Sequence, residues 1–487
     1  MTMSFRLLMG LFLAVILAIG IIWWDRRAFG PRALWKGPYY TLSLPPVLFV
    51  YWAALLLGSV VLNWGGRLTD TLFSLWLILF FQLSLYNLLL LALMPLLRRW
   101  FKPQTCALLW LLPIYLYVLQ YDAMAPSRPR LVLQVPDLPI GAILLVWVIG
   151  FAAVLGWKIF SHIRFRRSIL AGARPVDDPA MVELWRGLQA RLNPHEDKCY
   201  PLVISPRVQS PLSVGLWSIH VVLPEHAYSP EQLSLILKHE LIHILRRDSL
   251  SKFFFVTCTA LCWFNPLMWL AMDRSAQDME LSCDEAVLFD ADPDTRRTYA
   301  GLLLDTAGDS RGFTTCLSAS ASSLRYRLKR IVKPTRRLAG SLLAGAATFG
   351  LVMTSGFVSL AYETNPAAEL LFSSGSQEDY ALRSVALTAP SSPESQWICT
   401  DPEALLDYLA DLEGRKITGG YTLSDATHQL SIRYADSQRS YRVVLADDYL
   451  ICRPRSSSVA QEGVYLISGG VDWDVLTGLL EPEPPLQ

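Results

Sequence analysis

The feature of this chain that most constrains its fold is a set of long apolar runs, most of them in the first third of the sequence. A bilayer span needs roughly 20 mostly apolar residues, and six segments reach or approach that length. They are about 5–24, 42–63, 71–97, 106–121, 140–160 and 338–361. Only 17% of the residues are charged, against about one quarter in soluble globular proteins. We therefore predict a polytopic α-helical membrane protein.

The first and fourth spans are the ones that length alone does not settle. The first could be a signal peptide, but its apolar stretch ends in Trp-Trp-Asp-Arg-Arg at residues 23–27 without a preceding small-residue cleavage site. We therefore expect an uncleaved span. The fourth, from Cys106 to Tyr121, is short and contains Pro113, which leaves the exact number of spans open.

The charges of the loops predict the orientation of these spans. Cytoplasmic loops accumulate Lys and Arg, and the loops after the first, third and fifth spans are rich in them, whereas the second and fourth loops are poor. This alternation predicts an external N-terminus, a cytoplasmic segment 161–337 and an external region 362–487. Basic residues just before the last span repeat the signal: Arg325, Arg327, Lys329, Arg330, Lys333, Arg336 and Arg337.

The last span contains small residues at intervals of about four, which allow helices to approach closely in lipid. The alternative is a span rich in Gly and Ala without a special partner. The residues concerned are Gly340, Ala344, Gly345, Ala346 and Gly350.

Within the cytoplasmic segment, the sequence predicts a helix that carries two histidines one turn apart. Ser229 can cap it, Pro230 suits its first position and Gln232 completes a capping box. His239 and His243 then share one face, where two imidazoles can bind one metal ion. Glu240 is rotated by about 100° from His239, so it can take a proton from a metal-bound water instead. The alternative is two helix histidines hydrogen-bonded to their neighbours.

A third protein ligand is expected from an acidic segment about 37 residues further on. Asn265-Pro266 can begin the helix that carries it. Glu280 and Asp284 face the same way, so Glu280 could complete a tetrahedral zinc site, and Asp284 could accept a hydrogen bond from the far nitrogen of a zinc histidine. Glu285 competes for the ligand role, and a solvated acidic face is the alternative to a metal site.

These segments together resemble the antirepressor metallopeptidases of the BlaR/MecR type, over about residues 160–335 and the membrane frame around them. The resemblance implies a gluzincin-like α+β zincin domain on the cytoplasmic face of a bacterial plasma membrane. It implies zinc on His239, His243 and Glu280, with Glu240 as the base. The segments that carry it are 205–224, 238–243, 246–248, 263–266 and 280–287.

The chain departs from this family in two respects. Five spans precede the protease segment, rather than the smaller number of the β-lactam sensors. The family's proline in the strand before the zinc helix is absent near Ser218 and Ile219. The segment from Ser213 to Leu223 nevertheless predicts an extended segment or a hairpin, and we expect its residues Val214, Gly215 and Leu216 to hold a peptide as an added strand. We expect His220 to be a surface or packing residue.

The apolar segment 251–272 is long enough to dip into the bilayer, but Asn265-Pro266 interrupts it. A full span would also place Glu280 and His239 on opposite sides of the membrane. We therefore expect a buried or interfacial helical segment.

The region after Tyr362 predicts a small extracytoplasmic α+β domain with an antiparallel sheet. A helix begins at Asp401-Pro402 and ends near Glu413, and a last helix begins near Asp472. Cys399 and Cys452 could form one disulfide if the region faces an oxidising compartment. The strands are expected at 429–434, 441–445, 449–452 and 464–468.

This C-terminal region lacks the Ser-x-x-Lys and Lys-Thr-Gly signatures of a penicillin-binding domain. Reaction with β-lactams is therefore not expected, and the external signal is left open.

The leading functional hypothesis is a sensor-transducer with four parts: a transmembrane region 1–160, a cytoplasmic zinc metalloprotease domain 161–337, a transmembrane helix 338–361 and a sensor-like domain 362–487. The expected partners are membrane lipid, an external signal, a cytoplasmic protein substrate such as a winged-helix repressor, and a second copy of the chain in a homodimer. The basic stretch from Ser318 to Arg337 is a candidate for self-cleavage or for a lipid anchor. With a net charge of +1, the chain lacks a basic footprint for direct nucleic-acid binding.

Two other classes of function remain open. One is a constitutive protein-processing or quality-control zinc protease, of the CAAX-protease kind, and the other is a non-catalytic receptor that retains the fold. Intramembrane site-two proteases fit less well, because Lys238, Arg246 and Asp248 flank the motif.

Overall fold

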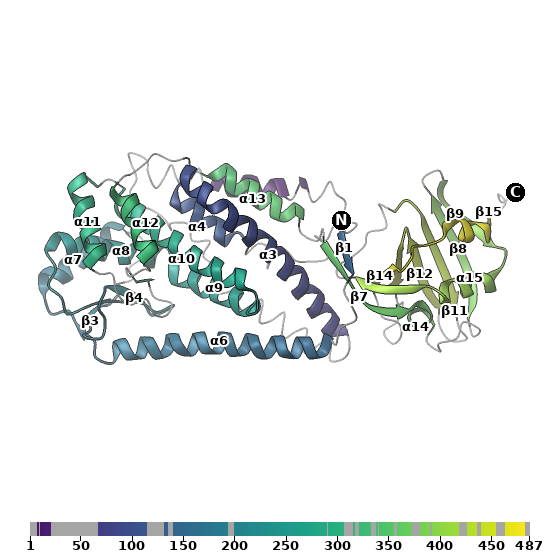
Figure 1. Cartoon of the computed structure of the whole chain (residues 1–487), viewed down its shortest axis with the longest axis horizontal. Helices are drawn as coiled ribbons and strands as arrows, with labels where there is room; N and C mark the ends of the chain where they lie inside the picture. Colours follow the sequence, from purple (N-terminus) through teal and green to yellow (C-terminus); the bar gives the residue numbers. More distant parts are fainter. Residues whose placement is uncertain are drawn as a thin grey trace.

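The computed structural model is elongated, with helices at one end and a β-rich domain at the other (Figure 1). It describes residues 7–8, 10–20, 67–113, 131–134, 140–192, 199–289, 291–305, 315–316, 321–332, 338, 340–354, 358–372, 380–389, 392–417, 426–435, 440–453 and 463–482.

Two helices of the described residues are long and apolar enough to cross a bilayer. They lie within α3 (Arg67–Trp100) and α6 (Ile140–Leu170), and they match the predicted spans 71–97 and 140–160. The first predicted span includes a shorter apolar helix, Gly10–Gly20. Of 106–121, the structure describes the end of α4 (Pro103–Leu111) and the following turn. The predicted span 42–63 lies outside the described residues.

The expectation of one helix over 338–361 is wrong for its last four residues, 358–361. The helix, α13, runs from Ser341 to Thr354, and a strand, β7 (Val358–Pro366), begins four residues later. The backbone of β7 pairs with β1 (Leu131–Gln134) on one side and with β10 (Glu413–Ile417) on the other. Pairing with these distant strands satisfies backbone groups that a helix would satisfy locally, and the sequence around 358 does not reveal those partners.

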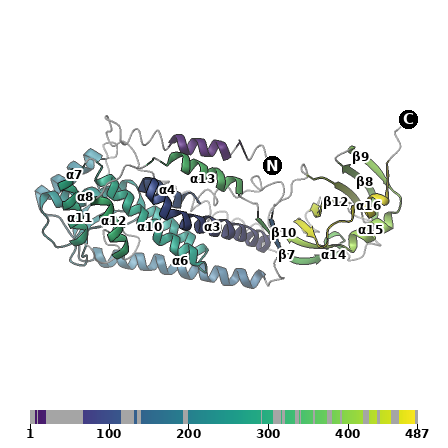
Figure 2. The ribbon, with the colours of Figure 1, turned by 45° about the horizontal axis from the view of Figure 1, so that its top comes forward.

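The small residues of α13 allow close helix packing, as the first interpretation of the span predicted. A Cβ atom on Gly345 would lie 3.0 Å from the carbonyl oxygen of Ala14, and one on Gly340 would lie 2.1 Å from the Thr105 side chain. Figure 2 shows the N-terminal helix alongside α13. Glycine at these two positions therefore lets α13 approach both the first helix and α4.

The α/β end of the molecule contains a five-stranded sheet in the order β2-β3-β5-β4-β6. The predicted hairpin is confirmed, because β4 and β5 pair in antiparallel fashion. Gly215, at the turn between them, has φ +120°, and a Cβ there would lie 2.1 Å from the Ser218 carbonyl oxygen, so only glycine fits. The strands are β2 (Arg174–Pro175), β3 (Leu202–Ile204), β4 (Leu212–Val214), β5 (His220–Leu223) and β6 (Thr315–Cys316).

Six helices pack with this sheet or join it to the spans. The break predicted at Asn265-Pro266 separates α9 from α10. The helices are α7 (Pro179–Leu192), α8 (Pro230–Leu245), α9 (Asp248–Leu261), α10 (Pro266–Val287), α11 (Pro293–Asp305) and α12 (Ala321–Val332).

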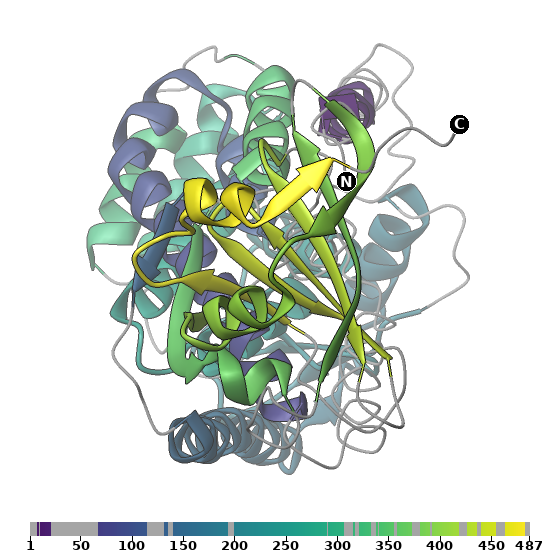
Figure 3. The same cartoon turned by 90° about the vertical axis from the view of Figure 1, so that its right-hand side faces the viewer.

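The C-terminal domain contains most of a second sheet, in the order β1-β7-β10-β14-β13-β12-β11-β8-β9-β15. In the end-on view of Figure 3 this sheet lies in front of the helices. The strands predicted at 429–468 and the helix after Asp401-Pro402 are confirmed, although that helix ends at Ala410 and Glu413 begins β10. The remaining elements are α14 (Ala367–Leu371), β8 (Ala381–Ala389), β9 (Ser392–Cys399), α15 (Pro402–Ala410), β11 (Gln429–Ala435), β12 (Ser440–Ala446), β13 (Tyr449–Arg453), β14 (Gly463–Ile467), α16 (Trp473–Gly478) and β15 (Leu480–Pro482).

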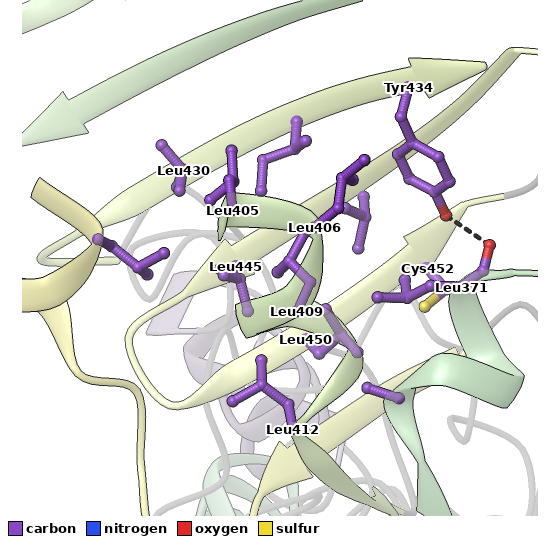
Figure 4. Packing of buried hydrophobic residues seen from close by; sticks show 14 of the residues in the cluster. Leu371, Leu405, Leu406, Leu409, Leu412, Leu430, Tyr434, Leu445, Leu450 and Cys452 are labelled. Atoms are coloured by element: carbon purple, nitrogen blue, oxygen red, sulfur yellow. Dashed lines mark hydrogen bonds between the residues drawn. The ribbon is translucent and has the colours of Figure 1, made fainter. Parts of the chain in front are cut away.

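The core of this domain lies between α15 and the strands. Leu405 and Leu409 of α15 pack with Leu430 and other inward-facing leucines of the sheet (Figure 4). The disulfide considered for Cys399 and Cys452 is not formed, because both are free thiols. Cys452 belongs to the apolar core instead.

Two backbone pairings join loops that are far apart in sequence. β1, from the loop before α6, pairs with β7 of the C-terminal region. Phe101, after α3, pairs with Leu338, before α13. In the orientation predicted from loop charges, β1 lies in an external loop and pairs with the outer end of the predicted span 338–361. Phe101 lies in a cytoplasmic loop and pairs with Leu338, at the inner end of that span. Figure 1 shows α3 and α6 extending from the α8–α12 group toward β1 and β7.

Candidate metal centre

The helix that carries the His-Glu-x-x-His motif begins as the sequence predicted. The Ser229 hydroxyl accepts a hydrogen bond from the Gln232 amide, and the Gln232 side chain accepts one from the Ser229 amide. The apolar side chains of α8 pack into the core around the sheet. His239, Glu240 and His243 are 0–1% exposed, so the motif lies inside the domain rather than on its surface.

Three potential ligand atoms converge between α8 and α10. The Nε2 atoms of His239 and His243 lie 3.0 Å apart. Glu280 Oε2 lies 3.7 Å from the first and 3.6 Å from the second. Ligand atoms on a tetrahedral zinc ion, at about 2.0–2.2 Å from the metal, are roughly 3.3–3.6 Å from one another. The three separations therefore fit one zinc ion.

The surroundings of the two Glu280 carboxylate oxygens also favour a cation bound beside the histidines. Its Oε2 is buried and accepts no hydrogen bond among the residues that the structure describes. Its Oε1 lies 3.4 Å from the ammonium nitrogen of Lys252. A buried carboxylate oxygen without a hydrogen-bond donor is costly, and a metal ion beside the two imidazoles would compensate it.

Each histidine presents its other ring nitrogen to a hydrogen-bonding partner. His243 Nδ1 lies 2.6 Å from Asp248 Oδ2, the first residue of α9. Arg247, in the left-handed region at φ 53°, makes the tight turn between α8 and α9 that brings Asp248 back to the histidine. A proton on Nδ1 leaves the Nε2 lone pair for a metal.

The hydrogen bond expected from a zinc histidine to Asp284 is not formed directly. His239 Nδ1 and Asp284 Oδ1 are 3.8 Å apart, which is too far. The Tyr299 hydroxyl of α11 lies between them, 2.8 Å from His239 Nδ1, and donates to Asp284 Oδ1 at 2.7 Å. Tyr299 can therefore accept from His239 while it donates to Asp284, which again leaves Nε2 for the metal.

Burial and neighbouring charges shift the pKa values of these groups. Burial, together with His243, lowers the pKa of His239 well below its ordinary value. Burial would raise the pKa of Glu280, but the nearby positive charges of His243, Lys252 and Arg327 hold it well below. Burial and Asp284 raise the pKa of Tyr299. The neutral imidazole, ionised carboxylate and neutral hydroxyl that result are the forms a metal site of this kind needs.

His243 differs from His239 in the direction of its shift. Burial alone would lower its pKa, but Cys283, Glu280 and the hydrogen bond to Asp248 together hold it well above the ordinary value. A metal ion bound at Nε2 would therefore compete with a proton for this imidazole.

Cys283 is an alternative third ligand that the sequence did not suggest. Ligand atoms of His239, His243 and Cys283 all lie within 4.8 Å of one another. However, the Cys283 sulfur lies 3.5 Å from Nδ1 of His239, the nitrogen that contacts Tyr299. Both Nε2 atoms lie near Glu280 instead, so the geometry favours Glu280. Glu285, the other competitor, is exposed.

The predicted substrate edge is already paired in part. On its outer side, β4 pairs with β6 through Leu212↔Cys316 and Ser213↔Thr315. Val214 and Gly215 are buried and Leu216 is partly exposed. At Ser213, the first residue of the predicted substrate segment, the chain itself therefore supplies an added strand. The pairing does not include Val214, Gly215 or Leu216, whose expected role stays a prediction.

Sequence reasoning missed three groups around the metal centre. The sequence indicated Asp248 as a flanking charge and as part of a family segment but not as a partner of His243, although its spacing of five residues from His243 is a usable signal. Tyr299 carries no signal of its own, because it lies 60 residues from His239. Arg327 was interpreted as a loop charge, yet it is 0% exposed and binds Asp284.

Comparison with known proteins identifies the segment that contains this centre. Residues 132–331 match the family described as BlaR1 peptidase M56. The regulatory protein BlaR1 of Bacillus licheniformis is 28% identical over 191 residues, which are 38% of this chain and 31% of that protein. The methicillin resistance mecR1 proteins of Staphylococcus aureus and Staphylococcus epidermidis are 25% identical over 149 residues, which are 30% of this chain and 25% of theirs. The chain thus spans about a third or less of the length of these relatives.

Proposed function

Because residues 132–331 match the family described as BlaR1 peptidase M56, we propose that this chain is a membrane-embedded, gluzincin-like zinc metalloendopeptidase of a signal-transducing type. One observation carries the proposal: Nε2 of His239, Nε2 of His243 and Oε2 of Glu280 converge at separations that fit one zinc ion. The motif on α8 supplies the base that such chemistry requires.

In this proposal His239, His243 and Glu280 hold the metal. Bound zinc supplies a water of lowered pKa and polarises the scissile carbonyl. Glu240 takes the proton of the attacking water and passes it to the leaving nitrogen. It suits this role because it is buried and follows His239 directly, but is turned off the ligand face.

The neighbouring groups prepare the ligands for this task. Asp248 and Tyr299 keep protons on the Nδ1 atoms, which directs both Nε2 lone pairs to the metal. Lys252 holds the second oxygen of Glu280. These contacts fix ring and carboxylate orientation before substrate arrives.

The substrate is proposed to bind as an added strand beside β4, along Val214, Gly215 and Leu216. The pairing of β6 with β4 supports this mode, because it places extended chain on the outer side of Leu212 and Ser213, directly next to Val214. It also supports the chain itself as one substrate, near the basic stretch 318–337. A cytoplasmic regulator, such as a winged-helix repressor, is the proposed second substrate.

The proposed signal comes from the C-terminal domain on the other side of the membrane. The pairings β1–β7 and Phe101–Leu338 support opposite sides for the two ends of the molecule, because each joins a loop to the end of the predicted span 338–361 that the loop charges place on the same side as that loop. The candidate spans lie between those ends.

The proposal is tested by zinc content and proteolysis of the full-length chain, the Glu240→Gln variant and the control Glu231→Gln. Glu231 is exposed in the first turn of the same helix. We expect equal zinc in all three, and cleavage of the chain itself or of fluorescent casein to fall about 10²–10⁴-fold in Glu240→Gln alone. Equal cleavage by Glu240→Gln would remove the proposed base.

A further inference from the structure

Helix α12 is basic, but its basic side chains have different surroundings. Arg325 and Lys329 are exposed, as expected for a solvated helix near a membrane. Arg327 is 0% exposed and lies against the metal centre. A guanidinium keeps its charge when buried, so this burial requires anionic partners.

Those partners are two carboxylates of the metal helix α10. Arg327 Nε lies 2.7 Å from Asp284 Oδ2, and Nη2 lies 2.6 Å from Asp284 Oδ1. Nη1 lies 3.5 Å from Glu280 Oε2, the oxygen that approaches the two imidazoles. The guanidinium thus binds both oxygens of Asp284 through two of its nitrogens, and its third nitrogen faces Glu280.

The same contacts extend to His239. Asp284 Oδ1 accepts hydrogen bonds from the Tyr299 hydroxyl and from Arg327 Nη2. The Tyr299 hydroxyl also contacts His239 Nδ1. Arg327 therefore influences one zinc ligand directly, through Glu280, and another through Asp284 and Tyr299.

Another residue of α12 contacts the end of α3. Arg330 Nη2 donates to the Arg98 carbonyl oxygen at 2.5 Å, and the Arg98 guanidinium lies over the Tyr326 ring, 5.5 Å from its centroid. Arg98 also pairs with Asp278 of α10. Helix α12 is thus held between the metal carboxylates and the end of a candidate membrane span.

We propose that Arg327 is a positioning residue of the metal centre. Through it, the metal affinity of the site depends on the position of α12 relative to α10. This inference rests on the metal site of the proposed function. A displacement of α12, from the α3 side or by cleavage of the chain beside it, withdraws the guanidinium from Glu280 and Asp284. The carboxylates then lose the geometry that the zinc ion requires. Arg327 itself does not touch the reacting atoms.

The test is the zinc affinity of the full-length chain in detergent, measured by competition with a chromophoric chelator. Outer-shell substitutions at metal sites typically weaken affinity about 10–100-fold, and we expect that loss in Arg327→Gln. Arg327→Lys keeps the positive charge but cannot bind both Asp284 oxygens as the guanidinium does. Its zinc affinity should therefore lie between those of Arg327→Gln and the wild type. Arg325→Gln, an exposed neighbour on the same helix, should bind zinc as the wild type does.

A double variant tests the path through Asp284. If Arg327 acts partly by holding that carboxylate, Arg327→Gln should weaken zinc binding less in an Asp284→Asn background than in the wild type. Fully additive losses would overturn the path through Asp284.

Thermal unfolding of the metal-free proteins separates positioning from folding. If Arg327→Gln does not fold, Arg327→Lys provides the test: weaker zinc binding at unchanged metal-free melting temperature supports the inference, and unchanged zinc binding overturns it. A wild-type chain that binds zinc in an Arg327-dependent way but cleaves nothing would refute only the peptidase function. Glu240-dependent cleavage with wild-type zinc affinity in Arg327→Gln would refute only the positioning role.

Discussion

At the scale of single residues, the metal centre is a buried polar network in which most groups have a specific partner. Asp248 binds His243, Tyr299 joins His239 to Asp284, and Arg327 neutralises Asp284. Such a network is costly unless it is complete. The hydrogen bonds of this network fix the orientations of the two imidazole rings, so the ligand geometry is determined before a metal ion binds.

The contact between Asp248 and His243 gives the sharpest residue-scale prediction. Asp248→Asn removes the negative charge that favours a proton on Nδ1, so we expect zinc affinity to fall about 10–100-fold. Chelator competition measures it. Asp294→Asn is the control, because the Asp294 side chain is 87% exposed and pairs only with an exposed arginine among the described residues. Equal affinity in Asp248→Asn and the control would show that the contact does not tune the metal.

At the scale of elements, α10 has two acidic faces with different tasks. Glu280 and Asp284 face the metal centre. Asp278, on another face, binds the Arg98 guanidinium through both oxygens at 2.8 and 3.0 Å and accepts from the Trp110 indole at 2.7 Å. One helix therefore joins the metal centre to α3 and α4, and this joint aligns Glu280 with the histidines of α8.

The Arg98–Asp278 pair yields a prediction about stability. Arg98→Gln leaves a carboxylate of 0% exposure without its cation, and breaking a buried pair in this way costs about 3 kcal/mol. We expect the free energy of unfolding in detergent to fall by about that amount. Arg99→Gln, at an exposed neighbouring position, should change it little. A loss in Arg99→Gln as large as in Arg98→Gln would mean that the pair is not what joins α10 to α3.

Local signals in the sequence predicted some elements well and others poorly. The capping box at Ser229 and Asn265-Pro266 located α8 and α10, because caps are formed by neighbouring residues. The alternating strands β11 to β14 followed from side-chain period. The strand at Val358, the contact of Tyr299 with His239 and the contact of Arg327 with Asp284 depend on partners 43 or more residues away, and no local pattern encodes them.

At the scale of the whole molecule, α3 and α6 lie between the end that contains the candidate metal centre and a β-rich end. The chain is continuous from the C-terminal sheet through β7 and α13 to Leu338, which pairs with Phe101 beside α4. Helix α12 precedes this pairing and carries Arg327. In the proposed function, an external signal would therefore reach Glu280 and Asp284 through packed helices and paired backbone.

The proposed sidedness predicts which cysteines a membrane-impermeant maleimide reaches in protoplasts. Cys199 is exposed at the peptidase end, so in a Cys399→Ser background we expect no labelling until detergent is added. Glu403→Cys in that background, at an exposed position of the C-terminal domain, should be labelled at once. Labelling of the background chain in intact protoplasts would mean that Cys199 lies outside, and the proposed orientation would then be wrong.

The central claim is that two imidazoles and the Glu280 carboxylate hold one zinc ion, and X-ray absorption at the zinc edge tests it most directly. For the zinc-loaded full-length chain we predict a first shell of nitrogen and oxygen only, at about 2.0–2.2 Å, and a loss of one light ligand in Glu280→Ala. A sulfur shell at about 2.3 Å would contradict the account, because it would make Cys283 the third ligand.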